Sequence, residues 1–239
     1  MKAPFTMPAI RMPDFSNCKK LVITAFGAVQ GDKIKTSQAV AKAISAAGES
    51  GGGIVVIPPG EWLTAQVHLK SNVNLHLMKG AVLLFSDNPS DYLPAVHSTW
   101  EGLECYNYSP LIYAYQCKNV AITGEGEVQA LMDNWKKWAG RPRAHMNSLK
   151  NLYYWAFDNK PVNERNMVND SSNLRPQFIQ FNRCENILID GISIKNSPFW
   201  TIHLYLSKDI VVRNVKVWAH GHNNDGIDPE YSRNILIEG

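Results

Sequence analysis

The chain of 239 residues has only four cysteines, and their spacing matches no metal-binding pattern. They are widely separated, at Cys18, Cys105, Cys117 and Cys184. Cysteines isolated in this way are expected to be free and buried. A disulfide is an alternative if the protein is exported. Cysteine usage therefore argues against a cysteine-based metal site and decides nothing about the compartment.

Charge and long apolar runs are scarce as well. Charged residues make up 19% of the chain, and the net charge is only +3. This mild positive charge is compatible with an acidic substrate and gives no indication of nucleic acid. No run approaches the roughly 18 apolar residues of a membrane span, and residues 1–14 contain no apolar segment of an export signal. The hydrophobic content of 45% predicts an ordinary globular protein.

Helical periodicity is confined to one segment, residues 36–47. Its apolar positions have helical spacing and are Val40, Ala43, Ile44 and Ala47. Thr36 and Ser37 offer a hydroxyl N-cap, and Gly48 offers a stop. We predict a helix over 36–47 that covers the open N-terminal edge of the β structure described next.

A unit of strand, polar turn and strand recurs in the second half of the chain, and a related copy begins at Leu111. Its copies are 178–191, 202–214 and 227–239. Alignment on Asn186, Asp209 and Asn234 gives repeats of 209 − 186 = 23 and 234 − 209 = 25 residues. Units of this period must stack to bury their apolar sides, as in a solenoid. Ile and Val dominate over Leu and no helix lies within a unit, so a parallel β-helix is favoured over leucine-rich repeats.

Stacking at this period brings distant residues together. Offsets of 25 and 23 residues place Asp225 beside Trp200, and Asp228 beside His203, which in turn lies beside Gln180. Carboxylates, an imidazole and an indole on one ridge suggest a groove for a chain of sugars. Indole faces pack against sugar C–H groups, and carboxylates and amides bind hydroxyls.

Three segments lack the strand repeat. Residues 86–110 are expected to be a loop, and residues 146–174 an insertion that either closes one end of the groove or is a tolerated surface loop. Residues 135–138 (WKKW), followed by Arg141 and Arg143, form a basic aromatic cluster. This cluster is expected either to bind uronate carboxylates or to be a solvated surface.

The runs 51–86, 175–203 and 223–239 together resemble glycoside hydrolase family 28, the polygalacturonases and related pectin hydrolases, and particularly its bacterial exo-acting members. The resemblance covers nearly the whole chain. It implies an all-β fold, a right-handed parallel β-helix of the pectin-lyase-like type. Residues 1–239 would form a single domain of this type, with 146–174 as an insertion.

The catalytic motif Asn-x-Asp-Gly-x-Asp of that family is matched by residues 223–228 (NNDGID). The resemblance assigns Asp225 to the acidic trio of an inverting hydrolase, in the pair that activates water. Asn223 would orient the site by hydrogen bonding, and Asp228 would support it or contact substrate. His203, Trp200, Arg141 and Arg143 are the other substrate-binding candidates.

The family pattern also has parts that this sequence lacks. The paired aspartates that include the general acid lie about one coil further on, and the Gly-His-Gly and Arg-Ile-Lys motifs come later still, whereas this sequence stops at Gly239. The chain is therefore expected to be an N-terminal portion without its C-terminal coils. One carboxylate cannot act as both acid and base, so the chain alone is expected to be weak or inactive. It should associate through its open end, and be a monomer when complete.

The expected function is cleavage of α-1,4-galacturonosyl bonds in pectin by an exo-acting polygalacturonase in the periplasm or outside the cell. No cofactor is implied. His220 and His222 lack the further ligands of a zinc site, so no metal is expected either. The partner would be a pectic polysaccharide, with no role for nucleic acid or a membrane. The alternatives are a rhamnogalacturonan or xylogalacturonan hydrolase, a calcium-dependent pectate lyase, and a non-catalytic carbohydrate-binding β-helix.

Overall fold

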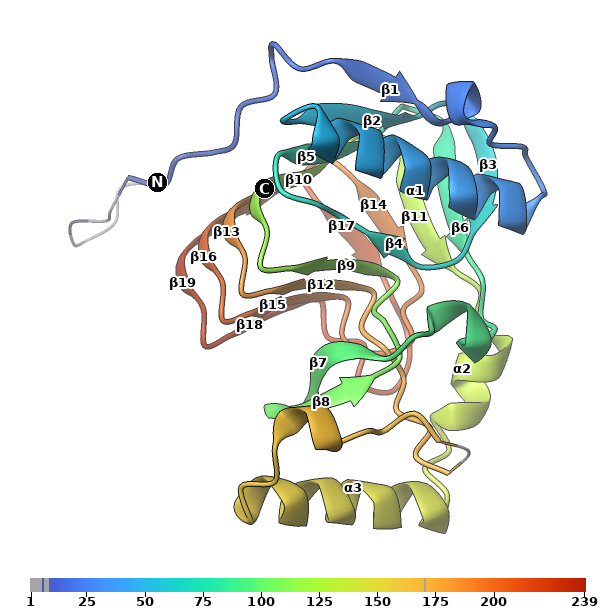
Figure 1. Cartoon of the computed structure of the whole chain (residues 1–239), viewed down its shortest axis with the longest axis vertical. Coiled ribbons are helices and arrows are strands. Elements are labelled where there is room, and N and C mark those ends of the chain that lie inside the picture. The colour runs from blue at the N-terminus through green and yellow to red at the C-terminus, as the bar shows by residue number, and fades with distance from the viewer. Residues whose placement is uncertain (1–5, 7–8, 170) are drawn as a thin grey trace.

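The computed structural model describes residues 6, 9–169 and 171–239. Residues 1–5 and 7–8, half of the segment in which we find no export signal, lie outside the described residues, as does residue 170. The main body is a coil of three parallel sheets, with a hairpin and two helices beneath it in the view of Figure 1. The predicted right-handed parallel β-helix is confirmed.

Each sheet takes one strand from each turn of the coil. The first sheet consists of β1 (Lys20–Val22), β2 (Gly53–Ile57), β5 (Val73–Leu77), β10 (Lys118–Gly124), β13 (Glu185–Asp190), β16 (Lys208–Arg213) and β19 (Arg233–Glu238). The second sheet consists of β3 (Gly60–Thr64), β6 (Ala81–Phe85), β11 (Glu127–Ala130), β14 (Ser193–Lys195) and β17 (Lys216–Trp218). The third sheet consists of β4 (Val67–His68), β9 (Ile112–Tyr115), β12 (Ile179–Asn182), β15 (Ile202–Tyr205) and β18 (Ile227–Glu230). A complete turn such as β12–β13–β14 therefore has three strands, where the repeat predicted two. The additional strand of each turn was not predicted because β14 and β17 are only three residues long.

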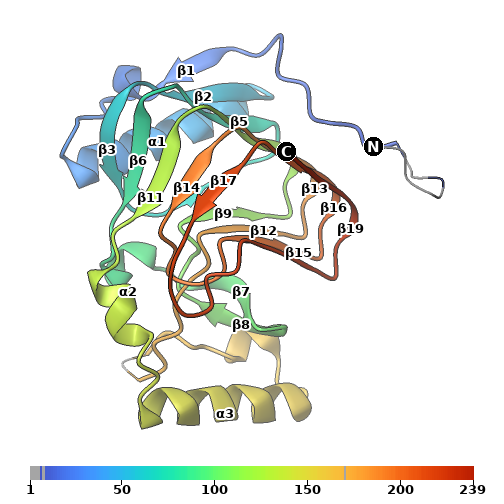
Figure 2. The same cartoon turned by 180° about the vertical axis from the view of Figure 1, so that it is seen from behind.

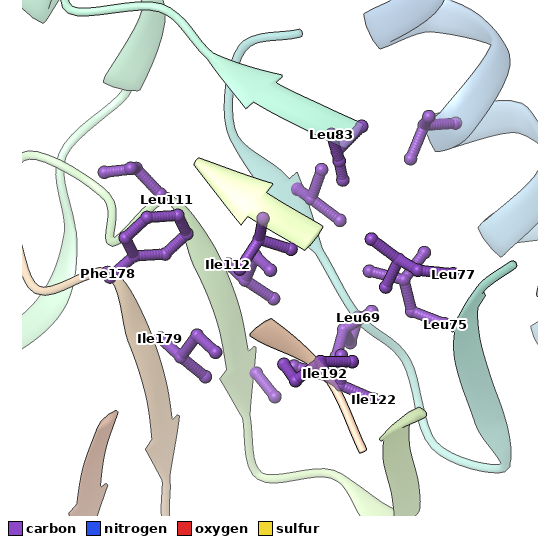
Figure 3. Close-up of a cluster of buried hydrophobic side chains, with 14 of the residues drawn as sticks. Leu69, Leu75, Leu77, Leu83, Leu111, Ile112, Ile122, Phe178, Ile179 and Ile192 are labelled. Carbon is purple, nitrogen blue, oxygen red and sulfur yellow. The ribbon is translucent and has the colours of Figure 1, made fainter. Parts of the chain in front are cut away.

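The interior of the coil is filled by aliphatic side chains that stack in register from turn to turn. Leu75, Ile122 and Ile189 occupy equivalent positions in β5, β10 and β13, and all three are fully buried. Figure 3 shows Leu75 and Ile122 among neighbours from all three sheets. Burying one such side chain contributes about 1.5–3 kcal/mol. This repeated stack favours the observed register between successive strands of the first sheet.

A ladder of left-handed residues marks the turn from the third sheet to the first. Asn72, Asn119, Asn186, Asp209 and Asn234 all have φ between 52° and 62°, a conformation that asparagine tolerates better than most residues. Three side-chain hydrogen bonds link neighbouring turns, from Asn119 to Asn72, from Asn186 to Asn119 and from Asn234 to Asp209. The Oδ1 atom of Asn186 is buried without a partner in the described structure, because Asp209, next along the ladder, carries a carboxylate and no amide donor. The residues used to align the repeat are thus structural.

Helix α1 (Lys33–Glu49) is longer than predicted and has a different cap. Asp32, not a hydroxyl residue, accepts the hydrogen bond from the Lys35 backbone N–H at 3.0 Å, and Gly48 lies within the last turn. The helix contacts β2, β3 and β4 of the first turn and so covers the N-terminal end of the coil (Figure 1). It packs beside the short helix η1 (Ile23–Phe26).

The segment predicted as a loop over 86–110 is ordered differently. It forms a short helix η2 (Pro89–Tyr92) and an antiparallel hairpin of β7 (Val96–Trp100) and β8 (Leu103–Asn107). The prediction was wrong because the hairpin strands mix aromatic, acidic and hydroxyl residues and carry no clear alternation. Trp100 and Cys105 of the hairpin are buried against residues of the 146–174 segment in a second hydrophobic cluster.

Two further helices, α2 (Asp133–Trp138) and α3 (Arg143–Phe157), and the short helix η3 (Val162–Glu164) follow β11. Figure 2 shows that the hairpin lies between the third sheet and α3. Trp135 of α2 is fully buried and meets the rings of Tyr92 and Trp138 edge to face, with ring centroids 5.6 and 5.2 Å apart. It therefore belongs to the core, and only the lysines of the WKKW cluster are exposed.

Candidate active site on the third sheet

The predicted ridge is present on the outer face of the third sheet. Gln180 pairs in register with His203, and His203 with Asp228. The Thr201 N–H donates to the Asp225 carbonyl at 2.8 Å, which sets Asp225 alongside Trp200 as the repeat predicted. The strand register predicted from the sequence is confirmed.

A chain of buried hydrogen bonds runs along this ridge. The Ser98 hydroxyl of β7 donates to Gln180 Oε1 at 3.1 Å, and Gln180 Nε2 donates to His203 Nδ1 at 2.9 Å. With Nδ1 as acceptor, the His203 Nε2–H faces Glu230 Oε2, also at 2.9 Å. Gln180 and His203 are both fully buried beneath the hairpin. His203 has no exposed surface for substrate, so in this arrangement it is a positioning residue that holds Glu230.

Two carboxyl groups of the motif differ in their surroundings. Asp225 is exposed on the loop before β18, whereas Asp228 is half-buried, and its Oδ2 has no hydrogen-bond partner among the described residues. Burial, together with the charges of Asp225 and Glu230, raises the pKa of Asp228 to about 7. Such a carboxyl group holds its proton until near neutral pH, which is the property a proton-transferring acid needs.

Glu230 and Arg175 are residues of this site that the sequence analysis missed. Glu230 lies two residues after Asp228 in β18, and the alternation of strand side chains could have placed it on the same face. Arg175 is buried, with its Nη1 donating to the carbonyls of Pro198 at 2.7 Å and His222 at 2.9 Å. A lone arginine before a repeat unit carries no sequence signal of such a role.

Both asparagines of the motif are held by neighbouring groups. Arg175 Nη2 donates to Asn223 Oδ1 at 3.5 Å, while the Asn224 amide donates to the carbonyls of Ser197 at 2.7 Å and Phe199 at 3.1 Å. Asn224 thereby ties the motif loop to the preceding turn. The predicted orienting role of Asn223 is compatible with a side chain whose oxygen is already fixed.

The aromatic side of the site is a continuous stack. Trp200 is half-buried and lies nearly parallel to Phe199, with 5.2 Å between ring centroids, and Phe199 stacks on Trp100 at 4.2 Å. Trp200 also meets His203 edge to face at 5.1 Å. The indole next to Asp225 is therefore fixed by the hydrophobic cluster beneath the hairpin.

The two predicted arginines have different environments. Arg141 lies near the motif loop, with Nη1 3.4 Å from His222 Nε2. Arg143, the first residue of α3, is exposed and forms no hydrogen bond or ion pair with the described residues. The structure thus brings Arg141 to the site and gives no contact that does so for Arg143.

A hollow of about 330 Å³ opens beyond Glu230. It lies between the hairpin turn and the last two strands of the third sheet, and its lining residues are Gly102, Leu103, Glu104, Arg165, Tyr205, Leu206 and Tyr231. Glu104 is fixed by an ion pair with Arg183 and by a hydrogen bond of 3.0 Å to His97 Nε2. Its polar lining groups include two tyrosine hydroxyls and the Arg165 guanidinium.

The described part of the chain contains no group of three His, Cys, Asp or Glu side chains arranged to hold a metal ion. All four cysteines are free. No helix among the described residues has the length and apolarity required to cross a membrane.

The fold and the ridge define the class of protein: a right-handed parallel β-helix with carboxylates on the outer face of one sheet. The sequence profile described as "Glycosyl hydrolases family 28" matches residues 162–239. Over 95% of its length the chain superposes on a hyperthermoactive exopolygalacturonase from Thermotoga maritima, with 38% sequence identity and a TM-score of 0.88. The chain is therefore similar to proteins of glycoside hydrolase family 28, by profile over residues 162–239 and by fold over nearly its whole length.

Curated relatives show the same similarity. The chain is 28% identical over 211 residues to a Vitis vinifera protein named "Probable polygalacturonase", and 26% identical over 245 residues to the exo-poly-alpha-D-galacturonosidase of Dickeya chrysanthemi. These matches include 85% and 92% of this chain but 38% and 39% of the relatives. The structure from Thermotoga maritima is covered to 53%. The chain therefore spans between about two fifths and half of the length of these relatives.

Proposed function

We propose that this chain carries part of the active site of an exo-acting polygalacturonase that hydrolyses α-1,4-galacturonosyl bonds. The observation that carries the proposal is the pair Asp225 and Asp228 at the open end of an otherwise covered ridge. The names of the relatives support galacturonan as the substrate. Rhamnogalacturonan and xylogalacturonan are the second choice, because they share the uronate units.

In the proposed mechanism Asp225 is the exposed carboxylate that activates water. Asp228 lies next to it with a raised pKa and contacts the sugar through a carboxyl group that is partly protonated near neutral pH. Inversion needs a further carboxylic acid on the opposite side of the bond. The family resemblance places that acid on the turn after β19, so we propose the activity for a polypeptide that also contains that turn.

The covered part of the ridge supports exo action. The hairpin lies over Gln180 and His203, which are fully buried, while Asp225 is exposed. A polysaccharide on this sheet meets the hairpin on the N-terminal side of the carboxylates and continues only in the other direction. Only one or a few sugar units then fit between the hairpin and the cleaved bond.

A polymeric substrate does not enter cells, so we place the enzyme in the periplasm or outside the cell, acting as a monomer on pectic chains. Neither nucleic acid nor a membrane has a role in this proposal.

Product analysis tests the proposal. The longest natural polypeptide that carries this sequence is incubated with polygalacturonate, and the products are followed by chromatography and NMR. The expected result is galacturonate or a single short oligomer from the first time point, in the inverted anomeric form. A spread of oligomers at early times refutes exo action, the retained anomer refutes the mechanism, and unsaturated ends indicate a lyase.

A further inference from the structure

The side of the acid site that faces the α2–α3 connection carries positive charge that is not balanced by an ion pair. Arg141 and Arg175 both approach the motif loop, through His222 and Asn223. Neither arginine has a carboxylate within ion-pair distance among the described residues. We propose that Arg141, Arg175 and the Asn223 amide form an anion pocket that binds the carboxylate of a uronate unit next to Asp225. This inference rests on the proposed function.

Arg175 is the buried base of the pocket. The residue is 4% exposed, and its guanidinium lies over the Phe199 ring at 5.5 Å and donates only to neutral oxygens. Burial and the charge of Arg141 lower its pKa to about 10, against a smaller opposite effect of Glu101 on the hairpin. A buried cation without a counter-ion is costly, and an anionic ligand relieves that cost.

Arg141 supplies the accessible half of the pocket. Its Nε atom is buried without a hydrogen-bond partner in the described structure, while its Nη1 faces His222 Nε2. A guanidinium can only donate, so Arg141 Nη1 donates and His222 Nε2 accepts in this contact. Arginine in this state has donors left in the planar fork that matches a carboxylate.

Asn223 joins the two arginines to the reacting carboxylate. Its Oδ1 accepts from Arg175, so the amide NH₂ points away from that guanidinium, and no hydrogen bond of this NH₂ occurs among the described residues. Asn223 is two residues before Asp225 in the same loop. A sugar whose carboxylate contacts the arginines is therefore close both to the amide donor of Asn223 and to the Asp225 carboxylate, two residues further on.

The backbone offers a clean variant for the test. Arg141 has φ +48°, a conformation that asparagine adopts more readily than arginine. Arg141→Asn therefore removes the guanidinium without adding backbone strain, and its folding stability should equal or exceed that of the parent. Arg141→Lys keeps the charge and loses the fork. Lys150→Met is the matched control, because Lys150 is an exposed cation of α3 whose contact is the Tyr154 ring.

Binding of trigalacturonate and of the neutral galactose trimer is measured by calorimetry on the longest natural polypeptide that carries this sequence, with unfolding midpoints recorded for each variant. We expect Arg141→Asn to weaken trigalacturonate binding by about 10- to 100-fold, the loss typical of one charge-assisted contact. Arg141→Lys should be intermediate, and Lys150→Met unchanged. Unchanged affinity in Arg141→Asn, or an equal loss in Lys150→Met, overturns the pocket.

Failure of the pocket and failure of the proposed function give different results. If polygalacturonate is hydrolysed and Arg141→Asn binds trigalacturonate normally, the function stands and the pocket is wrong. If nothing is hydrolysed but trigalacturonate binds and Arg141→Asn abolishes that binding, the pocket stands and the hydrolase assignment is wrong.

Discussion

Replacement of Asp228 by asparagine isolates the physical feature on which the acid site depends, a carboxyl group whose charged form the fold disfavours. Asp228 has a pKa raised from 3.8 to about 7 by burial and by the charges of Asp225 and Glu230. Asparagine has nearly the same shape and is neutral at every pH. The variant therefore removes the ionisation and leaves the packing.

The direction in which pH changes the folding stability follows from proton binding. Between pH 4 and 7 the folded chain keeps a proton on Asp228 that the unfolded chain has released, so folding stability falls as the pH rises through this range. The full shift of about three pH units corresponds to an upper limit of about 4 kcal/mol. Water reaches the half-buried side chain and screens part of this electrostatic effect. We therefore expect the loss of folding stability to be about 1–2 kcal/mol.

Urea unfolding of the 239-residue chain at pH 4, 6 and 8 measures the difference directly. Asp228→Asn should match the parent at pH 4 and exceed its stability by about 1–2 kcal/mol at pH 8. Glu49→Gln, at an exposed carboxylate of α1 that forms no hydrogen bond or ion pair with the described residues, controls for the loss of a surface carboxylate. A difference that is the same at pH 4 and pH 8, or a variant that is less stable at pH 8, refutes the reasoning.

Substitutions at three further positions test the packing of the coil and of the hairpin turn. Asp209→Asn gives the buried Asn186 Oδ1 a donor and completes the amide ladder. The free energy of unfolding in urea should therefore rise by about 1 kcal/mol. A decrease would contradict the stabilising role of the ladder. Cys184→Ser preserves the side-chain acceptor of the Cys117 N–H and should stay within about 1 kcal/mol of the parent, whereas Cys184→Ala should lose about 1–2 kcal/mol; equal values for the two variants contradict this role. Gly102→Ala should lower the melting temperature, because the residue has φ +88° and a Cβ there would lie 3.0 Å from Glu230 Oε1; an unchanged melting temperature would show that the hairpin turn is not constrained.

The periodic part of the fold could be predicted because its physics is local and repeated. Every turn buries the same aliphatic positions and carries a left-handed Asn or Asp, so the offsets between Asn186, Asp209 and Asn234 already gave the register. The hairpin and α3 could not be predicted in the same way. They are ordered by a separate cluster around Trp100 and Phe199, whose members are far apart in the sequence and follow no repeat.

The site could be predicted only where it depends on which residues pair between neighbouring strands of the third sheet. The register placed Asp228 beside His203 correctly, but it could not show that the hairpin buries His203 and leaves Asp225 exposed. The role of Arg175 depends on two carbonyl groups that lie 23 and 47 residues away. Such backbone contacts leave no pattern in side-chain identities.

The most direct test of the account is the turnover of Asp225→Asn on polygalacturonate, measured on the longest natural polypeptide that carries this sequence. The account predicts that kcat falls by about 10²- to 10⁴-fold, the contribution of one acid or base group, while the unfolding midpoint stays at the parent value because Asp225 is exposed. Turnover within a few-fold of the parent enzyme, with folding intact, would contradict it.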